Sequence, residues 1–131
     1  IFRKVNYVFV CISSLVCAFI LTIFFMIVLK LNFNFANMIA IPLLFSLGVS
    51  YPIYFIKRFD ELGDFKKLFS SNTPLAILFS GLTTIFSFST LFFSSHNGTS
   101  SMGLLLFISL SSTLITSLIL LPIFIKIFRI K

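Results

Sequence analysis

Acidic residues are scarce in this sequence, which contains only Asp60, Glu61 and Asp64. All three lie in one short segment between two long apolar runs, so no acid lies inside an apolar run. Charged residues of both signs make up 10% of the chain, whereas an average soluble domain contains about 25%. This shortage excludes a water-soluble domain, and the sequence predicts a polytopic membrane protein.

The residue types that build most active sites are also rare. The chain has one histidine, His96, and two cysteines, Cys11 and Cys17, in one apolar run. At this spacing the two cysteines point to different faces of a helix and cannot form a disulfide with each other. No Cys/His cluster has metal-ligand spacing, and no nucleophile–base pair is present. We therefore expect no enzyme activity, no metal site and no cofactor.

The basic residues give the chain a net charge of +7, yet they do not indicate nucleic acid as a partner. They lie at the ends of apolar runs, where membrane proteins place Lys and Arg. Nine of the ten fall on one side if the chain crosses the membrane four times, and only Lys30 falls on the other. The positive-inside rule then predicts that both termini are cytoplasmic.

Four apolar runs predict an all-α fold with membrane spans at residues 5–29, 37–56, 75–93 and 102–125. Each run suits a hydrocarbon core of about 30 Å. Between the second and third runs, Phe59, Leu62, Phe65 and Phe69 recur at helical spacing. This spacing predicts a short amphipathic helix at the cytoplasmic membrane surface. A mobile charged loop is the alternative for residues 57–72, and residues 94–101 are expected to form a turn.

The second run carries the helix-loosening residues Pro42, Gly48 and Pro52, which an anchor helix would not need. The third run is rich in hydroxyl residues. We predict a polar track between the helices, and its candidate residues are Ser50, Tyr51, Thr83, Thr84 and Ser87. The alternative is that these hydroxyls only bond to carbonyls of their own helix. Candidate positions of close helix packing are Gly48, Gly81 and Gly103.

Three blocks carry a resemblance to a known family, and they occur in the order ANMIAIPLL, LFSGLTT and SSHNGTSSMGLLL, followed by a late Leu-Pro. Residues 31–125 resemble the resistance-nodulation-division (RND) transporters, in particular the hopanoid-associated branch near the mycobacterial large membrane proteins and the sterol-sensing domain. The resemblance implies the last four helices of a larger exporter of hydrophobic lipids in a bacterial inner membrane. Its partners would be membrane lipids and the remaining transporter helices and extracytoplasmic domains, and a homo-oligomer is left open.

One departure from the family concerns Ser50. Many RND proteins carry an acid after Gly-Val in this helix, but here Gly48-Val49 is followed by Ser50. Serine does not titrate near neutral pH, so we expect proton coupling to come from parts outside this chain. The chain starts at Ile1, and we expect it to be a fragment of a longer protein. Two alternatives remain: a non-transporting remnant of such a transporter, and a sterol-sensing-like module that binds lipid for regulation.

Overall fold

The computed structural model describes residues 2–128, and within this range every regular element is a helix. The α-helices are α1 (Phe2–Val28), α2 (Phe35–Leu62), α3 (Phe65–Ser70), α4 (Thr73–Ser89), α5 (Asn97–Ile115) and α6 (Leu121–Ile127). A 3₁₀ turn η1 (Thr90–Phe93) continues α4, and a π-helical turn η2 (Thr116–Leu120) joins α5 to α6.

Four stretches are long and apolar enough to cross a membrane: Val5–Val28, Phe35–Leu62, Thr73–Phe93 and Asn97–Ile127. They confirm the predicted all-α membrane fold, and α3 lies between the second and the third, as expected. The helices extend several residues beyond some of the ranges expected from sequence. At the start of α5, for example, helix replaces most of the expected turn.

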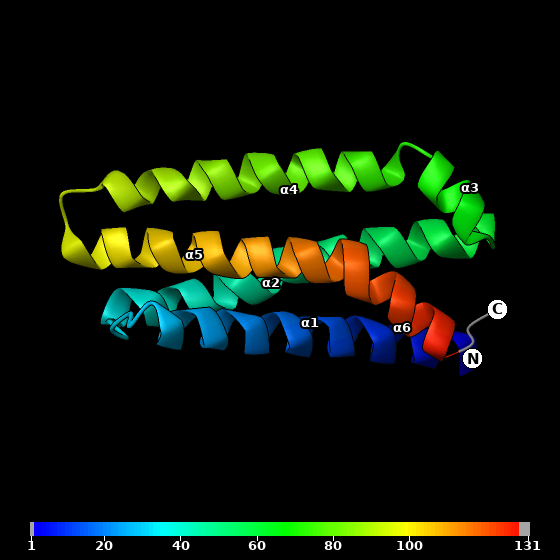
Figure 1. The fold of residues 1–131 in the computed structure, drawn as a ribbon, viewed down its shortest axis with the longest axis horizontal. Coiled ribbons are helices and arrows are strands. Elements are labelled where there is room, and N and C mark those ends of the chain that lie inside the picture. Colours follow the sequence, from blue (N-terminus) through cyan, green and yellow to red (C-terminus); the bar gives the residue numbers. More distant parts are fainter. Residues whose placement is uncertain (1, 129–131) are drawn as a thin grey trace.

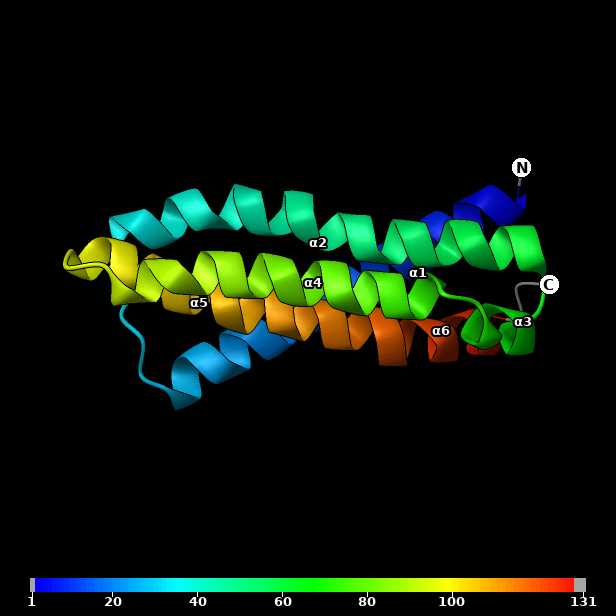
Figure 2. The ribbon, with the colours of Figure 1, turned by 90° about the horizontal axis from the view of Figure 1, so that it is seen from above.

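Helix α5 occupies the centre of the bundle and contacts α1, α2, α4 and η1 (Figures 1 and 2). The buried side chains of α2 show why this arrangement forms, since Ala40, Leu44, Gly48, Tyr51 and Phe55 recur every three or four residues. That spacing places them along one side of the helix. The sides of α1 and α4 that face away from α5 remain largely exposed. This is expected for surfaces that meet lipid or further helices.

One end of the bundle gathers five segments (Figure 1): the start of α1, the end of α2, helix α3, the start of α4 and the end of α6. The basic residues Lys57, Arg58, Lys66, Lys67 and Lys126 belong to this end. Lys30 lies at the opposite end, in the connection between α1 and α2. Arg129 and Lys131, which also entered the charge count, lie outside the described residues.

The predicted amphipathic segment is divided in two, which corrects the sequence interpretation. Gly63 adopts a left-handed backbone with φ of 66°, and its N–H donates to the Phe59 carbonyl, so α2 ends there. Glycine adopts this conformation without steric cost. Phe59 therefore belongs to α2 and Phe65 to α3, and their rings pack across the turn at 4.5 Å between centroids. Leu68 of α3 is fully buried, while Lys66 is exposed.

The last span, expected as one regular helix, bends where α6 begins (Figure 1). The Leu121 N–H donates to the carbonyl of Thr116, five residues earlier, which defines the π turn. Pro122 follows directly and has no N–H, and its ring would clash with the carbonyl four residues before it in a regular α-helix. The wider turn relieves that clash and accounts for the bend.

Candidate functional site: a polar groove between α2 and α4

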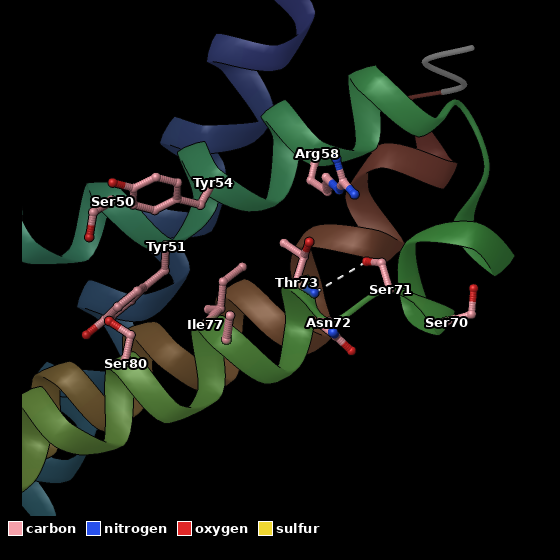
Figure 3. Close-up of a pocket in the computed structure, with 11 residues that line it drawn as sticks. Ser50, Tyr51, Tyr54, Arg58, Ser70, Ser71, Asn72, Thr73, Ile77 and Ser80 are labelled. Carbon is pink, nitrogen blue, oxygen red and sulfur yellow. Dashed lines mark hydrogen bonds between the residues drawn. The ribbon is translucent and has the colours of Figure 1, made fainter.

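A groove of about 700 Å³ lies between α2 and α4, and at the basic end of the bundle its lining includes the end of α3 and the α3–α4 connection (Figure 3). We call it the α2–α4 groove. Helix α2 contributes side chains at helical spacing, which puts them on one face. The lining residues are Ser50, Tyr51, Tyr54, Arg58, Ser70, Ser71, Asn72, Thr73, Ala76, Ile77 and Ser80. Most of these residues carry hydroxyl, amide or guanidinium groups, so the groove presents polar groups between two membrane-capable helices, although apolar atoms make up more of its lining.

Tyr51 joins the two walls of the groove. Its side chain is only 5% exposed and is directed from α2 towards Ser80 on α4 (Figure 3). Tyr51 also lies near the side chain of Thr84, one helical turn beyond Ser80. The Thr84 hydroxyl in turn donates to the Ser80 carbonyl at 2.9 Å. Tyr51 of α2 therefore lies beside the hydroxyl residues Ser80 and Thr84 of α4.

Ser50 lines the same groove but bonds within its own helix. Its Oγ donates to the Leu47 carbonyl at 2.6 Å. The resemblance to RND transporters puts an acid at this position, whereas the structure has a hydroxyl whose proton is already engaged. Ser50 can pass on a hydrogen bond through its lone pairs, but it cannot hold a charge near neutral pH.

Two residues of the predicted polar track lie away from the groove. Thr83 and Ser87 are exposed and are not part of its lining. Thr83 donates to the Phe79 carbonyl at 2.8 Å, and Ser87 donates to the Thr83 carbonyl at 2.8 Å. Both therefore make the own-helix bonds of the alternative interpretation. The structure brings Ser50 and Tyr51 to the groove and places Thr84 near Tyr51, while Thr83 and Ser87 lie on the outer side of α4.

The glycines expected at close contacts all lie where a Cβ would meet a neighbouring helix. A Cβ on Gly48 would lie 3.0 Å from Cγ2 of Thr113, and one on Gly81 would lie 2.5 Å from Cδ1 of Leu114. The contact at Gly103 differs because it involves backbone: a Cβ there would lie 2.5 Å from the backbone nitrogen of Phe92. Gly48 and Gly81 thus let side chains of α5 approach, whereas Gly103 lets the η1 backbone approach.

All three acids of the chain lie at the basic end of the bundle and have partners there. Asp60 accepts a hydrogen bond from the Tyr7 hydroxyl at 3.0 Å, and Glu61 pairs with Arg58 at 2.8 Å. Asp64 caps α3 by accepting from the Lys66 N–H. Across residues 2–128 no group of three or more His, Cys, Asp or Glu side chains could hold a metal ion. The lining of the α2–α4 groove contains hydroxyls, the Asn72 amide and the Arg58 guanidinium group, and none of the three acids.

Sequence reasoning did not identify the polar end of the groove. Arg58 was counted only as a topological charge, and the polar run from Ser70 to Thr73 only as a connection before a helix start. The signal was available on α2, because Tyr51, Tyr54 and Arg58 follow each other at helical spacing. On α4, Ser80 and Thr84 are four residues apart, so they lie on the same face of the helix.

Four membrane-capable helices, three of them packed around the fourth, with a groove between two of them, define a polytopic α-helical integral membrane protein. The chain is 41% identical over 112 residues to the hopanoid transporter HpnN of Burkholderia multivorans. It is 38% identical over 112 residues to the hopanoid transporter HpnN of Rhodopseudomonas palustris. Over this length the chain is related to the RND-type hopanoid transporters, and the resemblance drawn from the sequence is confirmed.

Each of these matches covers 86% of this chain but only 12% and 13% of the two relatives, so the chain corresponds to a small part of such a protein. No family model matches the chain. No solved structure matches it either.

Proposed function

We propose that this chain is the C-terminal four-helix membrane part of an RND-type exporter of hydrophobic, hopanoid-like lipids in a bacterial inner membrane. The observation that carries the proposal is the similarity to two hopanoid transporters over 112 residues. The two relatives are named as transporters, which favours transport over catalysis. The charge distribution supports cytoplasmic termini, because the basic residues gather at the end where α2 finishes and α4 begins.

In this proposal the α2–α4 groove supplies hydrogen-bonding groups but does not store the transported proton. Ser50, Tyr51 and Thr84 have hydroxyls that do not titrate near neutral pH. A transporter driven by the proton gradient needs a group that changes charge within the membrane. That group would come from parts of the transporter outside this chain, while the hydroxyls of the groove orient water or neighbouring polar groups.

The outer side of α4 is the proposed contact surface for the remaining transporter helices. Thr83 and Ser87 lie there with exposed hydroxyls, and Phe79 and Phe86 are exposed beside them. Hydroxyls and small side chains support close helix contacts in membranes. The large extracytoplasmic domains expected from the resemblance would be further partners, and a second copy of the chain is the alternative partner for this surface.

One observation favours a second candidate function, a remnant that inserts and packs but does not transport. Ser50 replaces the acid expected from the resemblance, and its hydroxyl is bonded to Leu47 within the same helix. A transporter that has lost its coupling acid would show this arrangement, provided that no other part supplies the charge.

A chimera separates the two candidates. The matching segment of the Burkholderia multivorans transporter is replaced by this chain, and hopanoid leaving the inner membrane is measured by membrane fractionation in a strain that lacks its own transporter. Transport by the chimera with native Ser50 supports the proposal. Transport only after Ser50→Asp supports the remnant. If a stably inserted chimera transports with neither residue, the assignment of this segment to a hopanoid-like exporter is wrong.

A further inference from the structure

The basic end of the α2–α4 groove has features that the proposed transport function does not use. Arg58 lies seven residues beyond Tyr51, about 10 Å along the helix, and reaches over the start of α4 (Figure 3). Its side chain is 42% exposed and pairs with Glu61 through one terminal nitrogen. Its Nε atom is buried and has no hydrogen-bond partner among the described residues. Because Nε is covered by protein atoms, a ligand in the groove would contact the exposed terminal nitrogens of the guanidinium group instead.

Other donors lie beside Arg58 in the lining of the groove. The Ser70 and Ser71 hydroxyls are engaged, because each donates to a backbone carbonyl of α3. Asn72 is exposed and makes no side-chain capping bond, and Thr73 is half-buried next to it. Arg58, Asn72 and Thr73 thus surround the mouth of the groove with a cation, an amide and a hydroxyl. This donor set suits an acceptor-rich anion such as a phosphate group.

The groove changes character away from this mouth. Ala76 and Ile77 on α4 and the Tyr54 ring on α2 form its next section, and Tyr51 and Ser80 follow further along the helices. Helices α2 and α4 both cross the membrane, so the groove runs from the level of lipid headgroups towards the hydrocarbon core. A cationic mouth above a less polar section matches an amphiphile with an anionic head. Basic pockets between spans on the cytoplasmic side recur as sites for anionic headgroups.

We infer that the mouth of the α2–α4 groove binds the phosphate group of an anionic phospholipid, with Arg58 as the cationic ligand and Thr73 as a hydroxyl donor. The lipid's glycerol and acyl portions lie along Tyr54 and Ile77. This lipid is a bound component distinct from a hopanoid-like cargo, and the site does not depend on whether the chain transports. Glu61 competes with the phosphate for Arg58, since it occupies one nitrogen of the guanidinium group.

The inference is tested with the full chain in detergent, by titrating phosphatidylglycerol and following thermal stabilisation and native mass spectra. Diacylglycerol and inorganic phosphate are titrated separately. We expect stabilisation by phosphatidylglycerol only. We expect Arg58→Gln to weaken it about tenfold, the effect of one charge-assisted hydrogen bond. Lys57→Gln is the matched control, because Lys57 carries the same charge but lines a groove between α1 and α2.

Three results overturn the inference. Equal weakening by Arg58→Gln and Lys57→Gln would mean diffuse charge attraction only. Equal stabilisation by diacylglycerol would mean that the groove binds apolar chains without recognising the headgroup. Equal stabilisation by inorganic phosphate would mean that the site binds free phosphate and not a phospholipid. If Arg58→Gln does not fold, Thr73→Val decides instead, since it keeps the side-chain shape and removes one donor. Several-fold weaker phosphatidylglycerol binding by Thr73→Val supports the site, and unchanged binding contradicts it.

Discussion

Replacing Gly103 by alanine should destabilise the bundle, because the new methyl group meets backbone. A Cβ at this position would lie 2.5 Å from the Phe92 nitrogen, 2.8 Å from the Leu91 carbonyl carbon and 2.9 Å from the Leu91 Cβ. Backbone atoms of η1 cannot rotate away as a side chain can. Helix α5 and η1 must therefore separate along their contact.

The magnitude follows from two opposing effects. Alanine favours helix over glycine by about 1 kcal/mol, whereas overpacking a tight contact costs about 1–3 kcal/mol. The contact at Gly103 belongs to the upper part of that range, so we expect Gly103→Ala to lose about 2 kcal/mol of unfolding free energy after the propensity gain is subtracted.

Two other glycines provide matched controls for the same substitution. A Cβ on Gly98 would lie 3.6 Å from the Ala36 Cβ, an ordinary contact, so Gly98→Ala should be neutral or stabilising. A Cβ on Gly81 would meet only the end of the flexible Leu114 side chain, so Gly81→Ala should fall between the two. Thermal stability of fluorescent fusions in detergent, followed by size-exclusion chromatography, gives the order. If Gly103→Ala is as stable as Gly98→Ala, the α5–η1 contact is not as close as the structure shows.

Three further predictions concern the ends of the helices. Asn37→Ala should lower the free energy of unfolding in detergent by about 2 kcal/mol, because the buried Asn37 amide donates to Asn32 and Ser101. Asn34→Ala removes no capping bond and should be near neutral. Equal losses in the two variants would contradict the structure. Lys30 has φ of 51°, so Lys30→Gly should stabilise by about 0.5–1 kcal/mol in the same assay, and a loss would argue against that backbone. With the two native cysteines replaced by alanine, a thiol-reactive reagent added outside should label Asn97→Cys but not Asp64→Cys, and the reverse pattern would invert the topology.

The fold could be predicted from the sequence because the length of an apolar run is set by the thickness of the bilayer. The helix break at Gly63 could not be predicted, because the sequence does not show whether a glycine lies inside a helix or at its end. Pro122 lay within the predicted last span, but a membrane helix can accommodate a proline in several ways, and only the structure shows that a π turn precedes it.

The positions of the candidate polar-track residues could not be predicted from the sequence, because hydroxyl spacing does not reveal how a helix is rotated. Thr83 and Thr84 are neighbours, yet Thr84 lies near Tyr51 while Thr83 is exposed. The rotation of α4 depends on contacts with other helices, such as that of Gly81 with Leu114 of α5. That contact joins residues far apart in sequence.

The most direct test of the account is a comparison of Ser50→Asp with Leu47→Asp. Ser50 lines the α2–α4 groove, whereas Leu47 packs against the apolar core. An acid in the middle of a span costs about 2.5–3.5 kcal/mol on insertion scales, and less where it faces polar groups or water. If the groove is a polar path, the inserted fraction and thermal stability of Ser50→Asp should stay close to those of the native chain, and Leu47→Asp should lose both. Equal losses in the two variants would show that Ser50 faces lipid or tight packing, and would contradict the transport role proposed for this groove.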